Sequence, residues 1–322
     1  MLTYIGRRIL YSIPVLALSS FLSFLFVSYA GNPLALLRQN PRFSHQTYLN
    51  LLHQEHLDKP VIVRYFYWLH DVFVDKLGKS LVTGQQIWPD ITRTMSHTAQ
   101  VIIISESLAI ILGIAIGIYS AIRQYSIFDY MFTSISFLGF ALPTFWLALL
   151  LQIVFTDIFL HWNVRIFYTS GLNSNPGGSP WSIDRLQHIA LPVATLLIIS
   201  FALYSRFMRA SMLDVINSDY ARTARAKGVP EWKVIMRHVF RNALIPITTV
   251  AALNIGGLLG GAIVTETVFG LDGIGFWFVN ALNQKDIYEV MAYLVVTSVL
   301  IVVFNLIADV TYGFLDPRIR YD

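Results

Sequence analysis

The 322-residue sequence contains no cysteine, which excludes disulfides, thiolate metal sites and cysteine nucleophiles. Charge is also scarce. Lysine, arginine, aspartate and glutamate make up 13% of the residues, about half of the roughly 25% usual in soluble domains. Apolar residues reach 55% and the mean hydropathy is +0.59, which excludes intrinsic disorder. The charged residues are too few to cover the surface of a soluble protein of this size. The low charge content and the high share of apolar residues indicate that the protein is embedded in a lipid bilayer.

Several long stretches with few charges could each cross a bilayer, which takes about 20 residues of helix. They are residues 9–30, 101–122, 130–156, 186–205, 243–265 and 290–308. Unpaired backbone groups are costly in lipid, so each stretch is predicted to be helical. The fold class is therefore an all-α polytopic membrane protein with six transmembrane helices. The first stretch imitates a signal peptide, but it is longer than the apolar part of such a signal, so we expect it to be retained.

The distribution of basic residues predicts the orientation in the membrane. If the N-terminus is cytoplasmic, Arg7, Arg8, Arg123 and most of the other lysines and arginines near the spans lie on the inside. Both termini are then inside, and the segment 206–242 is a cytoplasmic loop. This topology accounts for the net charge of +4, so the basic composition gives no support to nucleic-acid binding.

The loop 206–242 carries the most specific pattern. Asp219 is placed to cap a short helix over residues 220–227, Gly228 suits its C-terminal end, and Pro230 with Glu231 suits the start of a second helix. We interpret this hairpin as a docking element, with alanines that keep the helix slim and basic residues that steer a partner. An ordinary basic inside loop is the alternative. The docking residues are Asp219, Tyr220, Ala221, Arg222, Thr223, Ala224, Arg225, Ala226, Lys227 and Gly228.

A few residues within the spans are candidates for helix packing or for the transport pathway. Glycines spaced four residues apart predict close helix approach. They are Gly256, Gly257, Gly260 and Gly261. Glu106 is the one acid well inside a predicted span. The sequence supports a functional role and a structural pairing within the bundle equally. Glu266 lies near a span end, where a structural role is favoured, and Pro143 is predicted to kink the third span.

Residues 219–228, with Arg-Asn-Ala-Leu-Ile-Pro at 241–246, resemble the permease subunits of binding-protein-dependent ABC importers. The likeness is greatest to the first permease of the dipeptide/oligopeptide branch. Segments along the rest of the chain are similar to the same branch, namely 7–10, 138–146, 265–269, 305–309 and 316–320.

The hairpin also departs from the general signature of these permeases, which is Glu-Ala-Ala, three residues and Gly, with a later Ile-x-Leu-Pro. Ala224 and Gly228 are kept. Arg222 and Thr223 stand in place of Glu and Ala, and Pro246 falls five residues late. These departures are similar to the version of the loop found in the peptide branch.

The resemblance implies a type I ABC importer permease fold in the plasma (inner) membrane of a prokaryote. The implied partners are a sister six-helix permease subunit, two ATPase subunits or domains, an extracytoplasmic substrate-binding protein and the lipid bilayer. No cofactor or metal is expected on this chain, because it lacks a complete Walker A motif and the ATPases would bind ATP and Mg. The implied activity is import of di- or oligopeptides through a pathway of which this chain forms half. A nickel chelate, glutathione or another small solute is the alternative cargo.

The expected organisation is a first transmembrane helix at 1–30, an extracytoplasmic loop or lid at 31–96, the importer transmembrane domain at 97–313 and a cytoplasmic tail at 314–322. Spaced apolar residues predict short amphipathic helices in the loop. A membrane enzyme is disfavoured because no nucleophile–base or metal motif is present, and no catalytic residue is assigned. A secondary transporter is also disfavoured. It would be expected to carry several ion-coupling groups within its spans, and only Glu106 lies deep in one.

Overall fold

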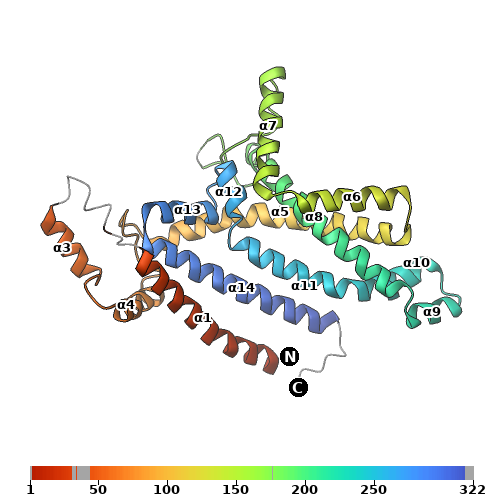
Figure 1. The fold of residues 1–322 in the computed structure, drawn as a ribbon, viewed down its shortest axis with the longest axis horizontal. Helices are drawn as coiled ribbons and strands as arrows, with labels where there is room; N and C mark the ends of the chain where they lie inside the picture. Colours follow the sequence, from red (N-terminus) through yellow and green to blue (C-terminus); the bar gives the residue numbers. More distant parts are fainter. Residues whose placement is uncertain (1, 31–33, 35–43, 176, 316–322) are drawn as a thin grey trace.

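The computed structural model describes residues 2–30, 34, 44–175 and 177–315, and these residues are almost entirely helical (Figure 1). Six helices are long and apolar enough to cross a membrane, which confirms the predicted fold class. The helices that contain these spans are α1 (Leu2–Ala30), α5 (Ile87–Ile122), α7 (Thr144–Trp162), α8 (Ile183–Ile216), α11 (Phe240–Leu259) and α14 (Ile287–Leu315). The shorter elements are α3 (His45–Gln54), α4 (Val61–Val74), α6 (Ile127–Ala141), α9 (Asp219–Ala226), α10 (Glu231–Lys233), the π-helix η1 (Val234–Val239), α12 (Ile263–Phe269) and α13 (Ile274–Gln284).

The long helices form a bundle in which α5 lies along α8, α11 packs on both α8 and α14, and α1 packs on the far side of α14 (Figure 1). Helices α9 and α10 lie at one end of this bundle, and α4 and α13 lie at the other. We call these the α9 end and the α4 end. Helices α1 and α14 are also joined by an ion pair between Arg8 and Asp309 at 2.9 Å.

The most extensive helix contact in the described residues is between α5 and α8, and a stripe of small residues makes it possible. Ala109, Gly113, Gly117 and Ala121 recur at every fourth position of α5, and all are buried. A Cβ atom on Gly113 would lie 2.7 Å from the Cβ of Tyr204, and one on Gly117 would lie 2.6 Å from the Cβ of Met208. Larger side chains would therefore push the two helices apart. The sequence analysis missed this stripe, although its spacing is the small-xxx-small pattern.

The glycines predicted for close packing fall into different environments. An added Cβ on Gly256 would lie 2.8 Å from Phe304, and one on Gly260 would lie 2.5 Å from Thr297, so both bring α11 against α14. Gly257 is exposed and faces open space. Gly261 has φ +122° in the turn from α11 to α12, so only two of the four glycines pack helix against helix.

The third predicted span is not one kinked helix. The chain leaves the helical conformation at Leu142 (ψ 128°) and Pro143 (ψ 134°), and this break separates α6 from α7. Proline lacks an N–H group and disfavours a helical residue before it, so a full break replaces the expected kink. Pro143 becomes the N-cap residue of α7, which turns away from the line of α6 (Figure 1).

The long segment between α1 and α5 is tied to the bundle at two places. The predicted amphipathic helices are present as α3 and α4, and Tyr65 and Trp68 of α4 pack around Phe24 of α1. Further along, the buried carboxylate of Asp286 accepts hydrogen bonds from Ser80 Oγ at 2.6 Å and from a backbone N–H of the same loop. The loop therefore rests against the start of α14, and α5 begins at residue 87, inside the segment assigned to the loop.

Candidate functional site

The predicted docking helix is present at the α9 end as Asp219–Ala226. Asp219 is its first residue rather than its cap, because Ser218 occupies the N-cap position in an extended conformation. Gly228 has φ +76°, and its N–H donates to the carbonyl of Arg225 at 2.9 Å. This is the left-handed conformation that glycine provides after a helix, as the sequence indicates.

The small face of α9 has a different role from the predicted one. Ala221 and Ala224 are buried among Met208, Met212 and Val239 of the same chain. The alanines therefore allow α9 to pack against α8 and η1, and the prediction that they leave a slim helix for a partner is wrong. Only Ala226 of the predicted alanines is exposed.

The two arginines of α9 are in different situations. Arg225 pairs with Glu231 through contacts of 2.8 and 3.0 Å, and its Nη1 donates to the carbonyl of Ile216 at 3.0 Å. The bonds to Glu231 raise the pKa of Arg225 and brace the two arms of the hairpin. Arg222 is exposed, so it is the arginine that remains accessible to another protein.

The outer face of the hairpin combines aromatic, apolar and basic side chains. Trp232 is 65% exposed, Met236 is 49% exposed and Tyr220 is 43% exposed. Lys233 lies over the ring of Trp232 at 5.6 Å. Aromatic residues and arginine dominate binding energy at protein interfaces, so this surface is suited to dock a protein. Trp232 and Met236 were not singled out from the sequence, because nothing in the local pattern shows which face of the second arm is outward.

The second arm of the hairpin continues directly into a span. Residues of α10, η1 and α11 form one helical rod, so the second helix predicted to start at Pro230 and Glu231 continues into a span. Val234 and Val239 of η1 are buried together with Ala121 of α5 and Met212 of α8. The hairpin is thus packed on the ends of two further spanning helices, so a displacement of α9 would be transmitted to all three.

Glu106 is buried between three spans. Its carboxylate accepts hydrogen bonds from the hydroxyls of Ser200 and Tyr204 on α8 and, at 3.3 Å, from the amide of Asn254 on α11. Its exposed fraction is 1%, and the described residues place no cation against it. This arrangement favours a role in joining α5, α8 and α11.

Glu266 of α12 is also buried and acts on the turn that follows it. It accepts hydrogen bonds from Thr98 Oγ1 at 2.6 Å and from the backbone N–H groups of Gly275 and Phe276 at 2.7 and 3.0 Å. Burial raises the pKa of Glu266, and these bonds oppose that shift. The carboxylate caps α13 and fastens the α12–α13 hairpin to α5, so the structural role favoured from the sequence matches its surroundings.

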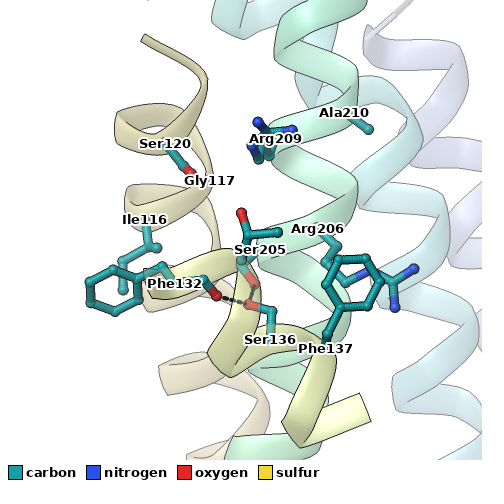
Figure 2. A pocket seen from close by; sticks show the side chains of 11 residues that line it. Ile116, Gly117, Ser120, Phe132, Ser136, Phe137, Ser205, Arg206, Arg209 and Ala210 are labelled. Carbon is teal, nitrogen blue, oxygen red and sulfur yellow. Dashed lines mark hydrogen bonds between the residues drawn. The ribbon is translucent and has the colours of Figure 1, made fainter. Parts of the chain in front are cut away.

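A buried ion pair that the sequence analysis missed lies near the α9 end. Asp129 of α6 is 2% exposed and pairs with Arg209 of α8 at 2.7 and 2.8 Å. It also accepts from Ser120 of α5 and from the N–H of Tyr125. The bonds from Arg209 hold the pKa of Asp129 well below its usual range. Figure 2 shows Arg209 and Ser120 beside a cavity of about 130 Å³ between α5, α6 and α8.

Comparison with known proteins identifies the family. Residues 113–321 match the family described as binding-protein-dependent transport system inner membrane component. The chain is 38% identical to the oligopeptide transport system permease protein AppB of Bacillus subtilis, over 100% of both chains. It is 34% identical to OppB of Mycobacterium tuberculosis, over 99% of both chains. It is 32% identical to the dipeptide transport system permease protein DppB of Escherichia coli, over 100% of this chain and 99% of that one.

These matches confirm the resemblance and, with the six apolar helices, the type I importer permease class. Families of this kind work with a partner permease, an ATPase and a substrate-binding protein. The chain belongs to the family of binding-protein-dependent transport system inner membrane components.

Proposed function

We propose that this chain is a permease subunit of an ATP-driven importer of di- or oligopeptides, and that ATP is hydrolysed on separate subunits. The α9–η1 hairpin is the observation that carries this proposal. It presents an exposed aromatic and basic surface, and it is built into α11 and packed on α5 and α8. The peptide cargo is supported by relatives of full length whose names state oligopeptide or dipeptide transport.

In this proposal the α9 end and both termini face the cytoplasm. Two ATPase subunits or domains close together when they bind ATP, and one of them binds α9. Because Arg225 and Glu231 brace the hairpin and its inner face is packed, the hairpin moves as a rigid body. The movement changes the arrangement of the spans, so the pathway opens alternately to the two sides of the membrane.

The α4 end would face the extracytoplasmic side and receive substrate from the binding protein. There the α12–α13 hairpin is fixed to α5 through Glu266, and the loop 78–86 is fixed to α14 through Asp286. A rigid outer end suits a surface that must dock a binding protein and return after each cycle. A sister six-helix permease subunit would supply the other half of the pathway.

The proposed function is tested by reconstituting the whole complex in vesicles and measuring uptake of labelled peptides. We expect uptake to require ATP and the binding protein and to persist when ion gradients are dissipated. Nickel chelates and glutathione, offered in parallel, should not compete with peptides. Uptake that follows an ion gradient at constant ATP would support a secondary transporter instead, and preference for a nickel chelate or for glutathione would support the alternative cargo.

A further inference from the structure

The cavity near the α9 end contains arginine donors that the fold leaves available. It lies between α5, α6 and α8 and is lined by Arg206 and Arg209 of α8 together with several hydroxyl groups. Arg209 uses Nε and Nη2 to hold Asp129, and Nη1 makes no hydrogen bond within the described residues. The guanidinium of Arg206 lies 4.6 Å from the ring centre of Phe137 and 4.9 Å from that of Phe140, and no described carboxylate pairs with it.

The walls of the cavity have two chemical characters. Hydroxyl groups of Ser120, Thr133 and Ser205 line it beside the arginines, and Ile116 and Phe132 line it as apolar surface. Figure 2 shows Arg209 and Ser205 above the rings of Phe132 and Phe137. The ring of Phe137 is 55% exposed, so the apolar wall reaches the outside of the bundle. A ligand that fits both walls has an anionic group attached to an apolar part.

The position along α8 places the cavity at the depth of lipid headgroups. Residues 186–205 carry no Asp, Glu, Lys or Arg, and their helix is roughly 30 Å long, which equals the thickness of the hydrocarbon core. Arg206 is the first charged residue beyond this stretch, and α8 continues to Ile216 before it reaches α9. The arginines therefore lie where the hydrocarbon ends on the α9 side of the membrane.

We propose that this cavity binds the phosphate of an anionic phospholipid from the leaflet on the α9 side. Arg206 and the free Nη1 of Arg209 hold the phosphate. The acyl chains leave along Ile116, Phe132 and Phe137. Basic pockets between spanning helices recognise anionic headgroups by this combination of charge and depth. The ion pair with Asp129 keeps Arg209 in place whether or not lipid is bound.

Binding of defined lipids to the delipidated full complex tests this proposal. The probes are phosphatidylglycerol, phosphatidylcholine with the same acyl chains, and glycerol phosphate, and bound molecules are counted by native mass spectrometry. The native complex should prefer phosphatidylglycerol over phosphatidylcholine and should not retain glycerol phosphate. Arg206→Gln should weaken phosphatidylglycerol binding about fivefold, as expected for loss of one basic contact, and leave phosphatidylcholine unchanged.

Arg123→Gln is the matched control, because Arg123 is an exposed arginine just after α5 that does not line the cavity. It should leave lipid binding unchanged. An equal loss in both variants would overturn the proposal in favour of general surface charge, and equal retention of glycerol phosphate would overturn it in favour of a free anion. If Arg206→Gln does not fold, a photoactivatable phosphatidylglycerol on the native complex decides: crosslinks should map to residues 132–137, and crosslinks only elsewhere contradict the site. None of these readouts depends on peptide uptake, so they stand apart from the proposed function.

Discussion

Besides Asp286, three carboxylates are buried among the described residues, and each accepts hydrogen bonds from other elements. Glu106 joins three spans, Asp129 joins the turn between α5 and α6 to α8, and Glu266 caps α13. Leaving a buried charge without its partner is strongly destabilising, so these residues specify which helices meet. The sequence shows that such acids are present in apolar surroundings, but their donors lie up to 168 residues away and no local spacing identifies them.

The ion pair of Asp129 gives a stability prediction. Asp129→Asn keeps the shape of the side chain and leaves Arg209 partly buried without its counter-charge. We expect the free energy of unfolding in detergent to fall by about 3 kcal/mol. Asp157→Asn is the control, since Asp157 pairs with His161 at an exposed position and such pairs contribute roughly 0–1 kcal/mol. Equal stability of the two variants would show that the buried pair does not secure α6.

At the scale of elements, close approach of helices depends on where a glycine lies rather than on its presence. Gly117 of α5 leaves no space for a Cβ against Met208, whereas Gly257 of α11 faces open space. The sequence analysis chose the glycines of α11 because they are spaced four residues apart. It passed over the stripe on α5, which has the same four-residue spacing. Only the packed structure distinguishes the two cases.

Two glycine-to-alanine changes test this distinction. Gly117→Ala should lower the free energy of unfolding by about 1–3 kcal/mol, because the new methyl group overlaps the backbone and side chains of α8. Gly257→Ala should raise it by up to about 1 kcal/mol, because alanine favours the helix and meets no neighbour. Unfolding of both variants in the same detergent provides the measurement. If Gly117→Ala were as stable as Gly257→Ala, α5 and α8 would not be closely packed at Gly117.

The arms of the hairpin give a second prediction at this scale. Arg222→Glu should reduce co-purification of the ATPase subunits without changing the unfolding midpoint. Arg222 is exposed and, unlike Arg225, does not join the two arms of the hairpin in the described structure. Arg225→Gln should instead lower the unfolding midpoint of the hairpin, since it removes the bonds to Glu231 and Ile216. Pull-down with a tagged ATPase and thermal unfolding distinguish the two effects. If only Arg225→Gln lost ATPase binding, Arg222 would not lie on the face of the hairpin that contacts the ATPase.

For the whole molecule, long uncharged runs predict the six spans and the family pattern predicts the hairpin, because both are local features. What the sequence does not show depends on tertiary contacts. The chain changes direction between α6 and α7 at Pro143, and the angle between the two helices depends on the residues that pack against them. The α12–α13 hairpin is not evident in the sequence, because its helices are short and depend on Glu266. Of the predicted tail at 314–322, residues 316–322 lie outside the described residues.

The most direct test of the account asks what touches the hairpin while the transporter works. A photocrosslinking amino acid is placed at Trp232, and at the exposed Trp162 of α7 as a control, in the intact complex in vesicles. The account predicts that position 232 crosslinks to an ATPase subunit, that the yield changes when ATP is bound, and that position 162 gives no such product. A complex that imports peptide with ATP while position 232 yields no ATPase crosslink would contradict it.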